Sequence, residues 1–214
     1  MRAAVFITFE GIEGSGKTTQ LRKLAERLPS AVVTKEPGGT PIGDRIRAIL
    51  LDPQSVGMDP TTELFLYAAS RRQHVAEVIK PALARGLVVL CDRYTDSTLA
   101  YQGFGRRLDL DELRTLNDWA TARLVPDLTL IFDLPEEVGL RRARSRNDSS
   151  ASLQDESRFE AEDLRFHQRV REGYRSLALA EPQRFVVIDA DGTPDEVFAR
   201  VAAELATRAP EVLG

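Results

Sequence analysis

The 214-residue chain has one cysteine, two histidines and one tryptophan, and only 7% of its residues are aromatic. With Cys91 alone an intrachain disulfide bond is impossible, which is typical of proteins from reducing compartments. No apolar run approaches the length of a membrane-spanning helix. The apolar segment 3–9 ends at Glu10 without the small-residue cleavage site of a signal peptide. We therefore expect a cytoplasmic globular protein that does not bind membranes.

Lysine is also scarce, because four of the 29 basic residues are Lys and the other 25 are Arg. Arginine binds phosphate better than lysine does, because its guanidinium can donate two hydrogen bonds at once. A GC-rich genome produces the same excess of arginine, however, and we favour that explanation. The net charge of −4 argues against attraction of the whole molecule to nucleic acid. A chain that is 43% hydrophobic can build a full core, and we expect one domain spanning residues 1–214.

Short β-branched segments alternate with longer helical patterns along the chain. The alternation predicts an α/β fold with a five-stranded parallel sheet, right-handed crossovers and helices on both faces. Near-continuous apolar strands are typical of such a sheet, and its ligands bind beyond the carboxyl ends of the strands. The expected strands are 4–9, 31–34, 87–91, 128–132 and 185–188, and the expected helices are about 17–28, 42–51, 61–84, 109–123, 135–146, 155–180 and 194–207.

Residues 11–18 read GIEGSGKT and match the GxxxxGK[ST] pattern between a predicted strand and a predicted helix. The glycines let successive backbone N–H groups point inward, and the helix N-terminus adds positive potential. We expect Lys17 to reach the β- and γ-phosphates and the Thr18 hydroxyl to ligate Mg²⁺. The motif predicts a P-loop NTPase fold, with nucleotide-binding residues Gly11, Ile12, Glu13, Gly14, Ser15, Gly16, Lys17, Thr18 and Thr19.

The P-loop alone does not separate kinases from switches or motors. The chain has no Asn-Lys-x-Asp guanine-reading motif and no carboxylate pair placed after a strand to activate water, which favours transfer to a bound acceptor. Asp92 and Arg93 follow the strand 87–91, where Asp92 can hold the water shell of Mg²⁺ and Arg93 can grip a second phosphate. A surface pair that caps the strand is the alternative. Asp133 could have either of two roles: it could orient the P-loop, or it could cap the next helix.

Three further segments accompany the P-loop in order and spacing: EPGGT at 36–40, DRY at 92–94 and YQG at 101–103. With them the chain resembles the thymidylate kinase family from about Phe6 to the C-terminal helix. The resemblance implies Mg²⁺-dependent transfer of the γ-phosphoryl group of ATP to dTMP, giving dTDP and ADP for dTTP synthesis. It also implies a homodimer.

The resemblance further implies roles for single residues. Arg93 would hold the dTMP phosphate, Glu13 would lie near the sugar 3′-hydroxyl, and Arg71 would bind the thymine carbonyl. Tyr67 stands where the family usually has a Phe that stacks on the base, so its hydroxyl needs a partner. The other residues expected at dTMP are Glu36 and Arg47 near the acceptor phosphate, and Ser97, Thr98, Tyr101 and Gln102 along the sugar and the thymine edge.

Tyr67 and Arg71 are four residues apart and so share one face of a predicted helix, which is otherwise mostly apolar. An arginine on such a face needs acceptors if it is buried, or it extends to solvent at the rim. The resemblance favours base recognition. The two histidines, His74 and His167, are expected to have structural or surface roles.

The P-loop contains no basic residue at positions 12–15, and the family type with this feature supplies its arginine from a mobile lid. We expect that lid at about 141–157, where an arginine-rich segment precedes a Ser-rich one. Its closure would stabilise charge on the transferred phosphoryl group and exclude water. A solvated helix face is the alternative. The expected catalytic residues are Lys17, Glu13, Arg93, Arg142, Arg144 and Arg146.

Two rival functions stay open from the residues alone. The first is a kinase for another monophosphate, such as UMP or GMP, and the second is a nucleotide-binding regulator without transferase activity. The apolar faces of helices 61–84 and 109–123 fit either a dimer interface or a buried core.

Overall fold

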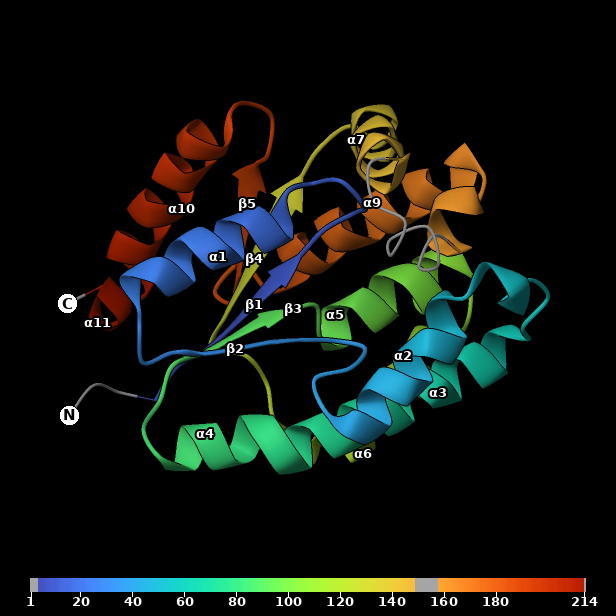
Figure 1. The fold of residues 1–214 in the computed structure, drawn as a ribbon, viewed down its shortest axis with the longest axis horizontal. Coiled ribbons are helices and arrows are strands. Elements are labelled where there is room, and N and C mark those ends of the chain that lie inside the picture. The colour runs from blue at the N-terminus through green and yellow to red at the C-terminus, as the bar shows by residue number, and fades with distance from the viewer. Residues whose placement is uncertain (1–3, 149–157, 214) are drawn as a thin grey trace.

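The computed structural model describes residues 4–148 and 158–213, apart from the side chains of 146–148. In these ranges a parallel sheet has the strand order β2-β3-β1-β4-β5 (Figure 1). The predicted α/β class, the number of strands and the parallel sheet are confirmed, and each strand begins and ends within two residues of its expected bounds. The strands are β1 (Phe6–Glu10), β2 (Val32–Lys35), β3 (Val89–Asp92), β4 (Leu128–Asp133) and β5 (Phe185–Asp189).

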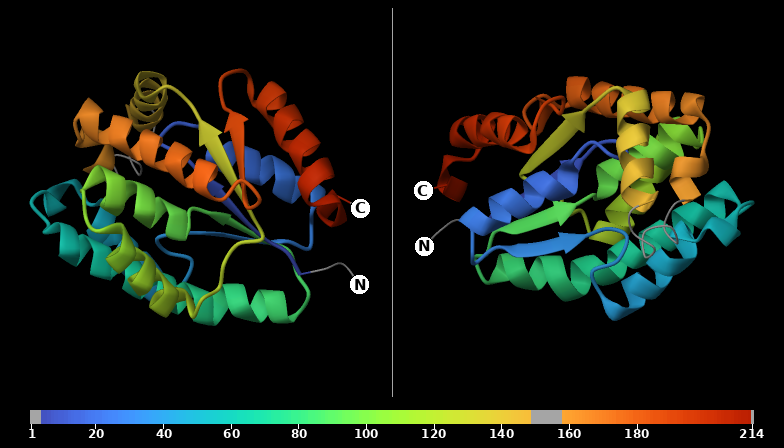
Figure 2. Two further views of the ribbon diagram at one scale, coloured as in Figure 1. Left: turned by 180° about the vertical axis from the view of Figure 1, so that it is seen from behind. Right: turned by 45° about the horizontal axis from the view of Figure 1, so that its top comes forward.

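Helices cover both faces of the sheet, as the sequence predicts (Figure 2). One face packs against α1 (Lys17–Arg27), α10 (Pro194–Arg208) and α11 (Pro210–Leu213). The other face packs against most of the remaining helices through two further apolar clusters. The remaining helices are α2 (Pro41–Leu51), α3 (Pro60–His74), α4 (Lys80–Ala84), α5 (Thr95–Thr98), α6 (Leu110–Thr121), α7 (Glu136–Asp148) and α9 (Leu164–Ala180), with short helices η1 (Pro53–Ser55), η2 (Val75–Ile79), η3 (Leu99–Gly105) and η4 (Arg158–Ala161).

The central strands are buried on both faces, but the two edge strands are not. Val33 of β2 and Val187 of β5 are each 49% exposed, so the expectation that every strand is covered on both faces is wrong at the edges. An edge strand has a neighbour on one side only, and the covering helices lie over the centre of the sheet.

The predicted helix 61–84 is present but changes its winding. Between α3 and α4 it passes through the π-helical turn η2, just before Pro81. Proline has no N–H to donate to the carbonyl four residues earlier, so the wider turn accommodates a hydrogen bond that an α-helix would lose.

A second π-helical segment was not predicted as a helix. Residues 95–105 form α5 and η3, which contain Gly103 and Gly105, and glycine disfavours helices. The reason for the glycines is close packing: a Cβ at Gly103 would lie 2.5 Å from Leu110 Cδ2, and one at Gly105 would lie 2.7 Å from Phe166 Cε2. This segment carries Tyr101, and π-helical turns are frequent at functional sites.

Helix α9 begins later than the sequence predicts. The expected start at residue 155 lies outside the described residues, and the chain from 158 to 161 forms the 3₁₀ turn η4. Asp163 then caps α9, because its carboxylate accepts a 2.6 Å hydrogen bond from the Phe166 backbone N–H. No helix in the described ranges is long and apolar enough to cross a membrane.

Candidate active site

A cleft of about 520 Å³ opens at the carboxyl edge of the sheet. It runs from the P-loop, past the end of β3, to a wall formed by α3 and η3. The predicted site residues that line it are Glu13, Gly14, Gly16, Lys17, Thr18, Thr19, Glu36, Arg47, Tyr67, Arg71, Asp92, Arg93, Ser97, Thr98, Tyr101 and Gln102. Gly11, Ile12 and Ser15 shape the P-loop without lining the cleft. Residues that line the cleft without having been predicted include Arg22, Leu51, Phe159 and Glu160.

The Lys17 side chain is folded back onto the P-loop. Its Nζ donates to the backbone oxygens of Gly11 at 3.0 Å and Ile12 at 2.7 Å, and to Ser15 Oγ at 3.3 Å. Burial, reinforced by the positive charge of Arg93, lowers the pKa of Lys17 to about 7. A lysine held on neutral carbonyls at low pKa would gain from an anionic partner, which is what a triphosphate supplies.

Two oxygen ligands suited to a hard cation lie beside the P-loop. Thr18 Oγ1 donates to Asp92 Oδ2 at 2.5 Å, so the hydroxyl and the carboxylate meet at one point of the cleft. Within the described residues, no group of three or more His, Cys, Asp or Glu side chains could hold a metal ion. The Thr18–Asp92 pair fits Mg²⁺, which keeps several waters and binds through one or two protein oxygens together with phosphate.

Glycines at two positions let α7 rest directly on the P-loop. Gly14 has φ +69°, and a Cβ there would lie 2.0 Å from the Gly139 carbonyl oxygen. In return, a Cβ at Gly139 would lie 2.5 Å from the Glu13 carbonyl oxygen. Neither contact leaves room for a side chain, so the backbone of α7 buttresses the phosphate-binding loop.

Arg93 lies at the centre of the cleft in a left-handed backbone conformation, with φ 71°. Its Nη2 donates to Glu13 Oε1 at 3.0 Å and to Tyr101 Oη at 3.1 Å, and its Nη1 donates to Ser97 Oγ at 3.1 Å and Tyr174 Oη at 3.3 Å. The Tyr101 hydroxyl also donates to Glu13 Oε1, at 2.7 Å. The guanidinium thus faces two ring hydroxyls and a carboxylate, and a phosphate oxygen could replace each as an acceptor.

The charge state of Glu13 follows from this contact. Burial alone would raise the pKa of Glu13, but neighbouring positive charge outweighs burial and holds the pKa well below its usual range. His167 lies 3.6 Å away, beyond hydrogen-bond distance, so we assign the effect mainly to Arg93 at 3.0 Å. Glu13 is therefore a carboxylate at neutral pH.

A second buried acid, Glu10, lies beneath Arg93 and was not predicted as a site residue. Its Oε2 accepts hydrogen bonds from Ser97 Oγ at 2.6 Å and from Tyr174 Oη at 2.9 Å, and its Oε1 accepts one from the Tyr94 backbone N–H at 2.7 Å. Burial, aided by the nearby charge of Asp96, raises the pKa of Glu10 to about 7. Glu10 thus holds Ser97 and Tyr174, whose hydroxyls are two of the three that contact Arg93.

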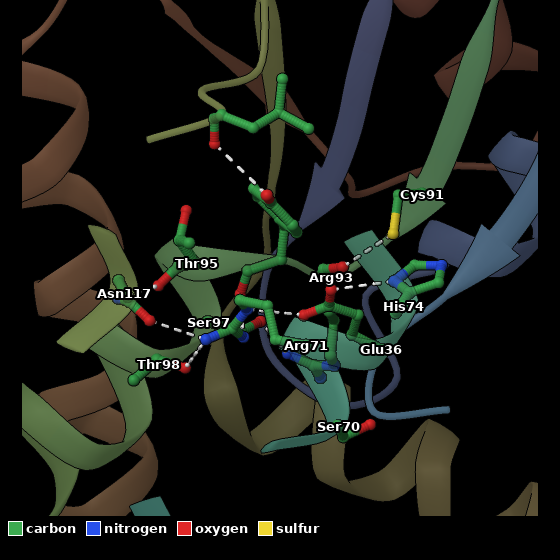
Figure 3. Close-up of polar contacts among 12 residues, drawn as sticks. Glu36, Ser70, Arg71, His74, Cys91, Arg93, Thr95, Ser97, Thr98 and Asn117 are labelled. Carbon is green, nitrogen blue, oxygen red and sulfur yellow. Dashed lines mark hydrogen bonds and ion pairs between the residues drawn. The ribbon is translucent and has the colours of Figure 1, made fainter. Parts of the chain in front are cut away.

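Arg71 is 1% exposed, so the alternative that it extends to solvent at the rim is wrong. Figure 3 shows its guanidinium close to Glu36, Thr98 and Asn117. Nε donates to Glu36 Oε2 at 2.7 Å, Nη1 donates to Thr98 Oγ1 at 2.9 Å and Asn117 Oδ1 at 2.7 Å, and Nη2 donates to the Tyr94 carbonyl at 3.0 Å. Arginine has five donor hydrogens, so one on Nη2 remains for a ligand at the cleft wall.

Glu36 completes this buried network. Its second oxygen, Oε1, lies 2.9 Å from His74 Nδ1 (Figure 3). His74 Nε2 in turn lies 2.6 Å from Thr34 Oγ1. His74 therefore has the structural role that the sequence indicated. Glu36 lines the cleft, but both its oxygens are bound by protein side chains, so its main contacts position Arg71.

Aromatic rings form the wall opposite the P-loop. Tyr67 and Phe159 have ring centroids 6.5 Å apart, and Phe159 meets the edge of Tyr101 at 5.6 Å. In the part of the chain that the structure describes, the Tyr67 hydroxyl has no hydrogen-bond partner. The partner expected from the sequence is therefore not among these residues. Flat apolar faces at this wall suit a stacked nucleobase.

The amide of Gln102 is fixed at the same wall. Its Nε2 donates to Glu63 Oε1 at 2.7 Å, and Glu63 is fully buried. Arg158 at 2.6 Å and Arg106 at 3.3 Å neutralise the Glu63 carboxylate. This cluster ties η4 to α3 and holds Gln102 in one orientation.

The structure does not bring Arg142 or Arg144, two of the three proposed lid arginines, into the cleft. Arg142 Nη1 donates to the Ala190 carbonyl at 3.3 Å, and its Nη2 lies 3.5 Å from Asp191 Oδ1, beyond β5. Arg144 is exposed, and neither residue lines the cleft. The Arg146 side chain and the segment 149–157 lie outside the described residues, so the mobile lid stays a prediction.

Asp133 has a role that the sequence did not indicate. Its two oxygens accept hydrogen bonds of 2.8 and 3.0 Å from Arg171 and one of 2.8 Å from Arg175. These pairs join the end of β4 to α9. They help to position Tyr174 of α9 beside Arg93, a contact between distant segments that no local pattern in the sequence could reveal.

Comparisons with known proteins agree with this geometry. The sequence profile of the family described as Thymidylate kinase matches residues 9–201. The thymidylate kinase of Geobacter sulfurreducens is 58% identical over 209 residues, covering 96% of this chain and 98% of that protein. That of Syntrophotalea carbinolica is 57% identical over 200 residues, covering 92% of each.

The fold has the same relatives. A crystal structure of thymidylate kinase from Ehrlichia chaffeensis superposes with a TM-score of 0.75 at 35% identity, covering 95% of this chain and 99% of that one. Family profile, curated relatives and solved structure therefore agree over nearly the full length. The chain belongs to the thymidylate kinase family.

Proposed function

We propose that the protein transfers the γ-phosphoryl group of ATP to dTMP, giving dTDP and ADP. The observation that carries the proposal is the continuity of the cleft, which joins the P-loop to the wall containing Tyr67, Arg71 and Gln102. Arg93 lies between the two ends. Transfer between two bound nucleotides needs one site of this shape, with cationic groups where the phosphates meet.

At the donor end, the P-loop backbone and Lys17 bind the β- and γ-phosphates, and Thr18 and Asp92 are the residues that would hold Mg²⁺. When bound, that ion neutralises charge on the phosphate oxygens. The protein adds position and fixed positive charge, and no side chain needs to form a covalent intermediate.

At the acceptor end, Arg93 binds the dTMP phosphate, and the free Nη2 hydrogen of Arg71 donates to a thymine carbonyl. Tyr67 supplies a face for stacking, and the oriented Gln102 amide lies along the same wall. Arg47, whose Nη1 donates to the Pro37 carbonyl at 3.1 Å, lines the cleft near Glu36. A pyrimidine carbonyl fits one remaining arginine donor better than a guanine edge does.

The test is ADP release from Mg-ATP with dTMP, dUMP, UMP, dCMP and GMP as separate acceptors at one low concentration. A strong preference for dTMP supports the proposal. A preference for another monophosphate would keep the kinase and reject the thymine contacts. ATP binding without transfer to any acceptor would favour a regulator.

We also propose that Arg142, Arg144 or Arg146 reaches the phosphates when α7 and the segment after it close. Gly139 packs α7 on the P-loop, so movement at the far end of this helix can reach the bound phosphates. Separate Ala variants at the three arginines would be compared for kcat with Mg-ATP and dTMP. Wild-type kcat in all three would reject the lid role.

We propose further that two copies associate through α3 and α6, which pack side by side. Phe65 on α3 is 58% exposed and Trp119 on α6 is 79% exposed, although both are large and apolar. Exposed apolar side chains on neighbouring helices are typical of an interface. Sedimentation should give a dimer for the wild type and a monomer for Trp119→Lys; an unchanged mass for the variant would reject this interface.

A further inference from the structure

His167 of α9 is a buried polar side chain without an explanation in the proposed chemistry. It is 1% exposed, and neither ring nitrogen has a hydrogen-bond partner among the described residues. Buried polar atoms nearly always have a hydrogen-bond partner, so two buried imidazole nitrogens without one need an explanation. Its ring packs edge-to-face against Phe166, with ring centroids 5.4 Å apart. This contact explains why a ring is present but not why the ring is polar.

The nearest ionisable partner of His167 is Glu13. His167 Nδ1 lies 3.6 Å from Glu13 Oε2, and this oxygen is likewise buried without a hydrogen bond. The other oxygen, Oε1, is shared by Arg93 and Tyr101. Glu13 thus has one satisfied oxygen and one open oxygen, and the open one faces a potential donor that lies just beyond bonding distance.

Substrate binding would change this arrangement. If Arg93 binds the acceptor phosphate, as the proposed function requires, its Nη2 is drawn away from Glu13 Oε1. The Glu13 side chain is only 14% exposed, and a largely buried carboxylate that loses its cation is destabilised. Glu13 would then compete with the substrate for Arg93 unless another donor replaced the guanidinium.

We propose that His167 is a positioning residue that replaces Arg93 as the partner of Glu13 when the acceptor nucleotide binds. Its Nδ1–H donates to Glu13 Oε2 once the gap closes from 3.6 Å to about 2.8 Å, an ordinary hydrogen-bond length. The exchange releases Arg93 to the phosphate and keeps Glu13 oriented. This inference rests on the proposed function, because it assigns a use to the acceptor site.

The experiment compares His167→Leu with His167→Asn, which are close in size and differ in the donor placed near the Nδ1 position. Loss of a charge-assisted hydrogen bond should raise the KM for dTMP about tenfold or more in His167→Leu. The KM for ATP should stay unchanged, and His167→Asn should recover most of the dTMP affinity. His167→Phe fills the ring space without a donor and serves if the Leu variant does not fold.

The control for packing is Val170→Ala, which opens a space in the same buried face of α9 without touching a polar atom. It should lower thermal stability and leave the KM for dTMP unchanged. In a Glu13→Gln background, His167→Leu should add little to the KM, because the carboxylate that needs a donor is absent.

The outcomes separate the two proposals. A wild-type enzyme that does not phosphorylate dTMP would overturn the proposed function and this inference with it. An active wild type with the same KM for dTMP in the Leu and Asn variants would overturn the inference alone. An increase in KM for dTMP that Val170→Ala reproduces would also overturn it, because the cause would then be packing.

Discussion

Arg71 gives the sharpest test of the buried network, because its removal leaves the Glu36 carboxylate, which is 4% exposed, without its cation. In Arg71→Met the apolar length of the side chain is kept while four hydrogen bonds are lost, including the 2.7 Å pair with Glu36. Glu36 would keep only His74 as a neighbouring donor. Removing one partner of a buried ion pair costs about 3–5 kcal/mol.

That loss is large beside the free energy of unfolding of a typical domain, about 5–15 kcal/mol. For a chain of this size each kcal/mol lowers Tm by about 2–4 °C, so Tm should fall by roughly 6–20 °C. Urea unfolding and thermal melting would measure the change. The KM for dTMP should rise as well, because the donor proposed for the thymine carbonyl is gone.

The control is the pair Glu36→Gln and Arg71→Met/Glu36→Gln. If the unpaired charge causes the loss, neutralising Glu36 should make the double variant more stable than Arg71→Met. An Arg71→Met protein as stable as the wild type would refute the reasoning, as would a double variant whose losses simply add.

Three further predictions concern the phosphate end of the cleft. Lys17→Ala should lower kcat about 100- to 1,000-fold without changing the circular dichroism spectrum; wild-type turnover would reject the P-loop assignment. Folding raises the pKa of Glu10 from 4.5 to about 7, so the native state binds more protons between these values and the free energy of unfolding should fall as pH rises through them. Urea unfolding would measure the free energy of unfolding of the wild type and of Glu10→Gln at several pH values in this range. The decrease with pH should be smaller in Glu10→Gln, by an amount on the order of 3 kcal/mol. Gly139→Ala places a Cβ 2.5 Å from the Glu13 carbonyl oxygen and should raise the KM for ATP, measured by ADP release; an unchanged value would mean that α7 does not buttress the P-loop.

The strands and the P-loop were predictable because their information is local. A run of apolar β-branched residues, or a glycine pattern between a strand and a helix, has few structural solutions. The position of Arg71 on a helix face was predictable for the same reason, but its burial was not. Burial depends on Glu36, Thr98 and Asn117, which come from distant segments and converge only in the folded chain.

The residues that sequence reasoning missed share this property. Glu10 was noted only as the end of an apolar run, since its partners Ser97 and Tyr174 lie 87 and 164 residues away. His167 had no local signal, because its neighbour Glu13 belongs to the opposite end of the chain. The segment 95–105 was missed for another reason: helix propensity disfavours its glycines, and close packing against Leu110 and Phe166 overrides that preference.

The contacts within the cleft imply that ligand binding is an exchange of partners. Lys17 rests on neutral carbonyls, and a phosphate anion is a stronger partner for its ammonium group than a neutral carbonyl oxygen is. Arg93 instead rests on the charged Glu13, and breaking a largely buried pair of charges is costly unless both members find new partners. The donor phosphates therefore need only displace weak contacts, whereas the acceptor phosphate must compete with a carboxylate. His167 stands where it can remove that competition, so affinity for the acceptor should depend on α9 although no residue of α9 lines the cleft.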